Sequence, residues 1–155
     1  MPKLLTTALL VLGLAFSGTA WSHLDEDQPL QSYRQSWFAL IGFTVNPLFS
    51  MLKGETPWDE KTLAASSGQL ATLVNMEWRQ GFAPGSEQGT TRAKPEIWEN
   101  REDFKAKMED LRKAANELDE VVAGGEREAI AGSIGALGQA CKACHDEYKS
   151  KDYLY

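Results

Sequence analysis

The spacing of apolar residues is the feature that most constrains the fold. Downstream of residue 27, apolar residues recur three or four positions apart, as on one face of an α-helix, and over no useful length do they alternate with the period of a strand. The pattern divides into four segments, at about residues 28–52, 57–81, 95–123 and 126–149. The sequence therefore predicts an all-α fold, an antiparallel four-helix bundle, with no second domain and no internal repeat.

Start and stop signals mark several helix boundaries. Thr56 is a favourable N-cap and Pro57 suits the first helical position, where a missing amide costs nothing, so the second helix is expected to begin there. It is expected to end near Gly81. Pro95 should open the third helix, and the Gly124-Gly125 pair should end it, because glycine readily adopts the left-handed conformation that follows a helix.

The first 22 residues have the order of a secretory signal peptide. Lys3 is followed by an apolar run from Leu4 to Phe16 and then by small residues. Cleavage after Ala20 and cleavage after Ser22 fit the small-x-small pattern equally well. The alternative is an uncleaved anchor, but the apolar run is shorter than the roughly 20 residues that a membrane-spanning helix needs. We therefore expect an exported protein of the bacterial periplasm with no membrane contact after processing.

Charge and composition exclude several functions. Removing residues 1–22 takes away one of the 16 basic side chains and none of the 22 acidic ones, so the mature domain, residues 23–155, carries a net charge of −7. This acidity argues against nucleic acid as a partner. No serine, histidine and carboxylate are arranged as a catalytic triad, and we expect no enzymatic activity.

Both cysteines lie in one short motif, Cys141-Lys142-Ala143-Cys144-His145, in the last predicted helix. The motif continues the apolar repeat of that helix, so we expect it on the buried face. Two thiols and an imidazole this close together can hold zinc, cycle a disulfide or carry a haem.

Three alternatives to haem, namely a redox pair, a zinc site and a structural disulfide, fit poorly. A thioredoxin-like redox pair needs a βαβ setting. A structural zinc site needs four ligands, and the only other histidine is His23, beside the new N-terminus. A structural disulfide between cysteines three residues apart on a helix would be strained. Cys-x-x-Cys-His is the attachment signature of c-type haem, so we predict one covalent haem c per chain, with a metal site or a disulfide as the alternative.

Four motifs, in order, resemble the cytochrome c′ family of class II c-type cytochromes. They are "YRQS" early in the first helix, "KG" followed by "PWD" between the first two helices, "PGSEQGTTRAKPEIW" before the third helix and "CKACHDEYK" at the end. Together they span nearly the whole mature chain. The resemblance implies a four-helix bundle with the haem attached to the C-terminal helix.

The resemblance also implies roles for individual residues. Cys141 and Cys144 would hold the haem, and His145 would be the proximal ligand of the iron. Arg34 and Gln35 would contact the haem propionates, a role that suits the paired donors of arginine. The alternative for Arg34 and Gln35 is a solvent-facing helical surface.

Four further residues have weaker assignments. Arg92 and Lys94 would also meet a propionate, with solvated loop charges as the alternative. Trp98 and Phe104 would flank the porphyrin, with simple core packing as the alternative.

Two positions depart from patterns in the family. Members often have an arginine after the tyrosine of the motif, near the proximal face, and this chain has Lys149, which keeps the charge but loses the planar fork. Low-spin members place a methionine four residues after the arginine of the "RQ" pair, and here that position is Phe38. Phenylalanine cannot bind iron, so we expect a five-coordinate, high-spin haem whose vacant side is crowded by the Phe38 ring.

Two functions then remain. The first is a binding protein for diatomic gases, nitric oxide and carbon monoxide, that can also exchange electrons. The second is a dedicated electron carrier between periplasmic partners, with gas binding incidental. Members of the family are commonly homodimers through their first two helices, and we expect exposed faces of Trp37, Phe43 and Phe49 to permit one here.

Overall fold

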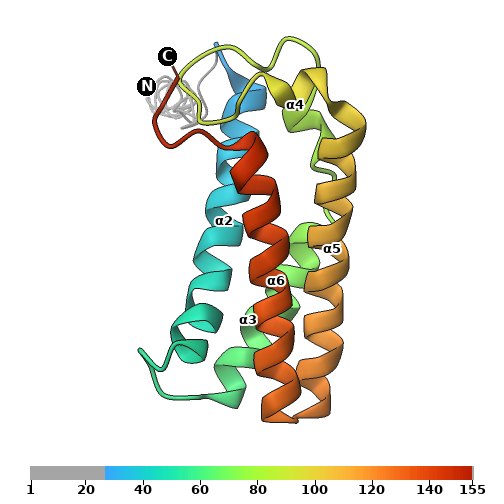
Figure 1. The fold of residues 1–155 in the computed structure, drawn as a ribbon. Helices are drawn as coiled ribbons and strands as arrows, with labels where there is room; N and C mark the ends of the chain where they lie inside the picture. The colour runs from blue at the N-terminus through green and yellow to red at the C-terminus, as the bar shows by residue number, and fades with distance from the viewer. Residues whose placement is uncertain (1–26, 155) are drawn as a thin grey trace, which may run out of the picture.

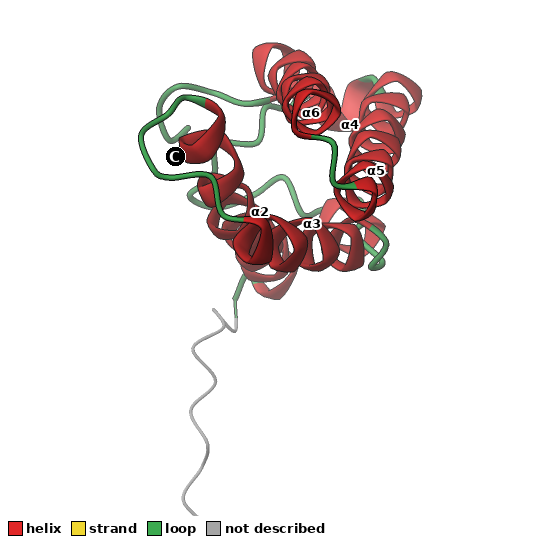
Figure 2. Ribbon diagram, turned by 90° about the horizontal axis from the view of Figure 1, so that it is seen from below, coloured by secondary structure: helices red, strands yellow, loops and turns green. Residues whose placement is uncertain are grey.

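The structure, a computed structural model, describes residues 27–154, so the predicted signal peptide lies outside the described residues. Successive long helices run in opposite directions (Figure 1), and Figure 2 shows them arranged around a common axis. The all-α, antiparallel four-helix prediction is confirmed. The helices are α2 (Pro29–Leu52), α3 (Glu60–Val74), the 3₁₀ turn η1 (Arg79–Phe82), α4 (Glu96–Glu99), α5 (Arg101–Gly124) and α6 (Arg127–Tyr148).

The second helix begins later than predicted. Its N-cap is Asp59, not Thr56, and the Asp59 carboxylate accepts a hydrogen bond from the Thr62 amide at 2.7 Å. Pro57 lies outside the helix. The next residue, Trp58, packs partly against the core, and the Arg127 guanidinium lies 4.7 Å from the centre of its ring. This contact joins the α2–α3 connection to the start of α6, which explains why the chain stays extended past Thr56.

Two other boundaries differ from the predictions. α3 ends at Val74 rather than near Gly81, because the Asn75 side chain bonds the Ala71 carbonyl and the side chain of Asn116 across the bundle. The predicted third helix is divided at Asn100 into α4 and α5. Gly125 does end α5, with a positive φ of 78°, as predicted.

The core is continuous through most of the bundle but is uneven between helix pairs. α5 packs closely on α3 and α6, and α2 packs closely on α3, whereas α2 and α6 touch at few places. An aromatic cluster fills the end of the bundle near α4, where the Phe82 ring contacts those of Trp78, Phe104 and Trp98. Because α2 and α6 make few contacts, the seam between them is where the bundle has room for a bound group.

The Asp59 cap gives a pH-dependent prediction. Hydrogen bonding by Thr62 lowers the pKa of the Asp59 carboxyl, so its contribution to stability is present above its usual pKa and is lost as pH falls through the lowered value. Asp59→Ala should lower the melting temperature by a few degrees at pH 7, with a smaller effect at strongly acidic pH. Asp59→Asn keeps an acceptor and serves as the control. Equal melting temperatures for Asp59→Ala and the unmodified protein at pH 7 would contradict this role for the cap.

Candidate functional site

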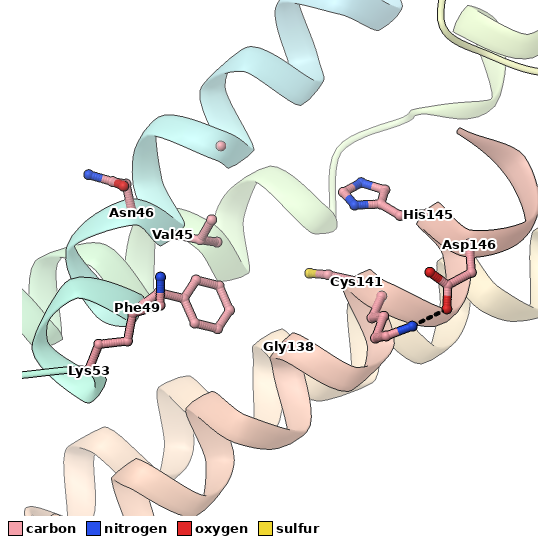
Figure 3. A pocket seen from close by; sticks show the side chains of 10 residues that line it. Val45, Asn46, Phe49, Lys53, Gly138, Cys141, His145 and Asp146 are labelled. Atoms are coloured by element: carbon pink, nitrogen blue, oxygen red, sulfur yellow. Dashed lines mark hydrogen bonds and ion pairs between the residues drawn. The ribbon is translucent and has the colours of Figure 1, made fainter. Parts of the chain in front are cut away.

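A groove with a volume of about 590 Å³ lies between α2 and α6 (Figure 3). From α2 it is lined by Val45, Asn46 and Phe49, and from α6 by Cys141 and His145. Figure 3 shows the sulfur of Cys141 and the ring of Phe49 directed into the space between the two helices. The groove therefore contains a thiol and an imidazole of the cysteine motif.

The two thiols are half-buried and free. Burial raises the pKa of the Cys141 thiol, and burial together with the neighbouring Cys141 raises the pKa of Cys144 to about 11. Both sulfurs are therefore protonated at neutral pH. Among the described residues, no group of three or more histidine, cysteine and acidic side chains could hold a metal ion.

His145 is exposed at the edge of the groove, and Lys142 and Ala143 are exposed too, so the prediction that the motif lies on the buried face is wrong except for the two half-buried cysteines. His145 is one turn beyond Cys141 on the same side of α6, and both residues line the groove, so the imidazole is exposed to the groove rather than packed between helices. Partial burial still lowers the pKa of the imidazole, and the positive charges of Lys149 and Arg92 lower it further. The ring is therefore neutral at pH 7 and keeps a nitrogen lone pair for a metal.

Phe38 lies on the α2 face that leads into the groove. Residues 38, 42, 45 and 49 follow helical spacing along one side of the helix, and the last three line the groove. The Phe38 ring is half-buried and packs edge-on against Trp37 and Phe82, with centroid separations of 4.8 and 6.2 Å. Phe38 thus connects the groove face of α2 with the aromatic cluster.

Arg34 is one turn before Phe38, and the solvent-facing alternative is wrong because its side chain is only 3% exposed. Its guanidinium donates to the carbonyls of Gly81 and Ser86, at 2.6 and 3.0 Å, and to the Thr91 hydroxyl at 3.3 Å. Within the described part of the chain, no carboxylate lies within 4.0 Å of this cation. Among residues 27–154, Arg34 is therefore a buried positive charge whose hydrogen-bond partners are neutral acceptors.

Gln35 and Arg92 both contact backbone groups at the same end of the bundle. Gln35 is exposed, and its amide donates to the Thr90 carbonyl at 3.0 Å. Arg92 is half-buried, and its Nε donates to the Ser150 carbonyl at 2.9 Å. Both side chains hold the loop before α4 in place.

Lys94 and Trp98 are also half-buried, and each has a backbone partner. The Lys94 ammonium donates to the Glu147 carbonyl at 2.8 Å, and the Trp98 indole donates to the Ala83 carbonyl at 3.3 Å. Phe104 is fully inside the aromatic cluster, so core packing accounts for it. Lys94 is thus held against the end of α6, in contrast to a freely solvated loop charge.

Sequence reasoning missed several residues that shape the site. Ser86 and Thr91, the buried acceptors of Arg34, lie inside the quoted loop motif, but only the structure shows that they share one donor. Gly81 is missed as well, although a Cβ atom there would come within 3.0 Å of the Arg34 Cβ. The buried Tyr148 hydroxyl donates to Asp103 at 2.5 Å, which fixes the end of α6 against α5.

The residues present fit a covalently attached haem. A side chain added at Gly42 would meet no atom within 4 Å, so the groove is open beside Cys141. One added at Gly138 would meet the Phe49 ring at 3.2 Å, so the groove closes there. Free thiols, a neutral imidazole and a buried cation that has no carboxylate partner among the described residues match the vinyl groups, iron and propionates of haem c.

Comparisons with known proteins agree with this fit. A family model described as Cytochrome C' matches residues 30–149. Cytochrome c' of Allochromatium vinosum is 32% identical over 147 residues, which cover 92% of this chain and 93% of that protein. The solved structure of cytochrome c prime from Shewanella frigidimarina is 30% identical with a TM-score of 0.77, covering 83% of this chain and all of that one.

A further solved structure is described with its ligand. It is a nitric oxide complex of a mutant cytochrome c prime from Alcaligenes xylosoxidans, 30% identical with a TM-score of 0.72, covering 83% of this chain and 100% of that one. The matched residues include all four long helices and the cysteine motif. The chain therefore belongs to the cytochrome c′ family, and it carries haem c, which this family attaches covalently through cysteines.

Proposed function

We propose that this chain is a periplasmic haem protein with a five-coordinate, high-spin iron that binds nitric oxide and carbon monoxide and can exchange electrons. The observation that carries the proposal is the groove itself, which places Cys141 and His145 of α6 opposite the α2 face that carries Phe38. When bound, the haem supplies an iron that changes oxidation state and can take up a diatomic ligand. The similar protein described as a nitric oxide complex supports gas binding.

The proximal side is provided by α6. Cys141 and Cys144 form the two thioethers, and the neutral imidazole of His145 is the protein's iron ligand. Because attachment and ligation come from consecutive turns of one helix, the haem position is fixed by a rigid element rather than by a loop.

Arg34 and Gln35 hold the haem propionates in this proposal. A buried cation without an anionic partner is costly, and a propionate would supply the missing charge. The guanidinium has five N–H donors, so it can retain bonds to the loop carbonyls while it binds a carboxylate. Arg92, at the same end of the bundle, is a second candidate for such a contact, and Trp98 would lie against the porphyrin edge.

The distal side is provided by Phe38. Its ring has no lone pair for the iron and no donor for a bound gas, so dioxygen, whose bound form carries partial negative charge, would receive no hydrogen bond from it. Methionine sulfur can bind haem iron, and Met51 lies farther along the same helix. Met51 is buried, and its sulfur accepts a hydrogen bond from the Asp59 amide at 3.3 Å. The site therefore favours nitric oxide and carbon monoxide over dioxygen.

Export is part of the proposal. Residues 1–22 would be removed as a signal peptide, after Ala20 or Ser22, and haem attachment would follow in the periplasm. In the part of the chain that the structure describes, no helix is both long and apolar enough for a membrane span.

The surface of α2 supports a homodimer, although with different residues from those expected. Trp37 is 3% exposed, and its indole donates to the Leu73 carbonyl at 2.9 Å, so the expectation that it is available to a partner is wrong. Phe49 is half-buried at the groove. Phe43 is 79% exposed and Leu40 is 52% exposed, and these two side chains form the apolar face that a second copy would cover.

Sedimentation equilibrium tests the dimer. We expect the unmodified haem protein to have twice the mass of the monomer at micromolar concentration. Phe43→Glu should give a monomer, because it places a charge in the apolar interface. Glu120→Gln, at an exposed position of α5, is the control and should leave the mass unchanged. A monomer for the unmodified protein would contradict the proposal.

Substitution of the cysteines tests the attachment. Cys141→Ala and Cys144→Ala should each leave one thioether, and the double variant should release all of its haem into acidified organic solvent. The unmodified protein should release none, and Ser133→Ala on the same helix is the matched control. Haem that resists extraction from the double variant would show that the assignment of the motif is wrong.

The optical spectrum with and without carbon monoxide tests the function. We expect a high-spin ferrous spectrum that changes when carbon monoxide is added. Phe38→Ala should raise the affinity about tenfold, or ~1.4 kcal/mol, since moving the ring away from a preferred rotamer costs energy of this order. Phe38→Met should give a six-coordinate, low-spin iron.

Met76→Ala, which removes an exposed apolar side chain outside α2 and α6, is the control and should leave the affinity unchanged. A dedicated electron carrier would behave differently, because it keeps the same ligands in both oxidation states. A low-spin ferrous spectrum in the unmodified protein that carbon monoxide does not alter would therefore favour electron transfer as the function.

A further inference from the structure

Tyr148, the last residue of α6, donates its hydroxyl hydrogen to a carboxylate. The side chain is buried, with 3% of its surface exposed, and the hydroxyl donates to Oδ2 of Asp103 on α5 at 2.5 Å. Asp103 itself is exposed, and the same oxygen lies 3.6 Å from the Lys107 ammonium. Tyr148 therefore combines a buried ring with a proton acceptor that is open to solvent.

Helical spacing places Tyr148 beside the haem attachment. Tyr148 follows Cys144 by four residues and Cys141 by seven, so the three side chains lie on the same side of α6 in successive turns. Cys144 also packs against the buried core to which Tyr148 belongs. Side chains four residues apart on a helix have Cβ atoms about 5–6 Å apart. Tyr148 is therefore a direct neighbour of the Cys144 sulfur that would hold the haem.

The acceptor distinguishes Tyr148 from two other tyrosines of the described chain. The Tyr33 hydroxyl donates to the backbone carbonyl of Glu77, which is a neutral acceptor, and Tyr153 is 65% exposed. Burial and the bond to Asp103 raise the pKa of the Tyr148 hydroxyl, so the phenol keeps its proton at neutral pH. A phenol that loses an electron becomes strongly acidic, and a bonded carboxylate can take the proton in the same step. Tyr148 is thus built to lose an electron and a proton together.

The tryptophans have the opposite surroundings. Three of the four tryptophans among residues 27–154 have a guanidinium over the ring, at the centroid distances 5.5 Å for Arg34 and Trp98, 5.0 Å for Arg79 and Trp78, and 4.7 Å for Arg127 and Trp58. The fourth, Trp37, donates its indole hydrogen to the Leu73 carbonyl, which is a neutral acceptor. An indole that loses an electron becomes a cation, and a guanidinium at this distance opposes the new charge. Oxidation of those three rings is therefore disfavoured.

We propose that Tyr148 is a redox-active residue that supplies one electron when a peroxide reacts with the haem, and that Asp103 accepts its proton. The inference rests on the proposed function, in which the sixth position of the iron is open to a small ligand. Hydrogen peroxide takes up two electrons and two protons and becomes two water molecules. One electron comes from the ferric iron and the other from Tyr148.

The proton of Tyr148 has a defined destination. The phenolic O–H bond breaks, the proton passes to Asp103, and solvent supplies the two protons that the peroxide takes up. Tyr148 is left as a neutral radical. The edge of the Phe104 ring, which is itself 4% exposed, packs against it at a centroid distance of 5.2 Å. The oxidising equivalent is thus moved from the haem to a ring that is shielded from solvent.

Electron paramagnetic resonance tests the inference. The haem-loaded ferric protein is mixed with an equimolar amount of hydrogen peroxide and frozen. We expect a tyrosyl radical, whose hyperfine splitting changes when the protein is made with ring-deuterated tyrosine. Tyr148→Phe retains the ring that packs on Phe104 and should lose the signal. Tyr33→Phe also removes a tyrosine hydroxyl, is the matched control and should retain the signal.

Asp103→Asn tests the proton acceptor. Its amide oxygen can still accept the hydrogen bond of Tyr148 but does not take the proton, so we expect a lower yield of the radical. In heavy water the radical of the unmodified protein should form more slowly, because a proton moves with the electron. The melting temperature of each variant reports any loss of stability separately from the loss of the radical.

Four outcomes would overturn the inference. They are a haem spectrum that peroxide does not change in a protein that binds carbon monoxide, a changed haem spectrum with no radical or with one that tyrosine deuteration does not alter, an unchanged signal in Tyr148→Phe, and an unchanged yield in Asp103→Asn. The first two use the unmodified sequence and hold even where a variant fails to fold. Failure of the proposed function looks different, since the spectrum of a closed, six-coordinate haem changes with neither carbon monoxide nor peroxide.

Discussion

The guanidinium of Arg34 is the group on which the functional end of this bundle depends. It is buried on α2 and donates to the Gly81 and Ser86 carbonyls and to the Thr91 hydroxyl, so one side chain holds both ends of the long connection before α4. Its charge lies 5.3 and 5.5 Å from the ring centres of Phe82 and Trp98, which partly offset the lost hydration. A side chain without donors would remove a partner from all three acceptors, of which the Gly81 carbonyl keeps the Ser86 hydroxyl and the Thr91 hydroxyl keeps the Ala93 amide.

The seam between α2 and α6 shows how the bundle reserves space for a large cofactor. Close packing of α5 on α3 and α6 gives a stable framework, and α2 is anchored to that framework mainly through α3. A side chain added at Gly42 would meet no atom within 4 Å, whereas one added at Gly138 would meet the Phe49 ring, so the seam is open at one level and filled at another. A haem held in this seam would add apolar packing between α2 and α6 as well as supply the iron.

Much of the fold and the centre of the site could be predicted from the sequence because both follow local rules. Helical periodicity gives the four long helices, and the spacing of Cys141, Cys144 and His145 is itself the haem signature. The errors arise where tertiary contacts decide. Trp58 and its contact with Arg127 move the helix start from Thr56 to Asp59, and the indole bond of Trp37 buries a residue that spacing alone leaves ambiguous. The acceptors of Arg34 lie 47 to 57 residues away along the chain, beyond any local pattern.

The sparse contact of α2 with α6 also bears on the order of events during maturation. The cysteine motif is near the end of the chain, so in an exported protein it crosses the membrane after the segments that form the other three helices. If every seam of the bundle packed tightly, folding would bury the cysteine thiols before haem could be attached to them. In this structure both thiols are half-buried, and the Cys141 thiol lines an open groove. An open seam of this kind would leave the Cys141 thiol accessible to a cofactor that arrives after the helices have formed.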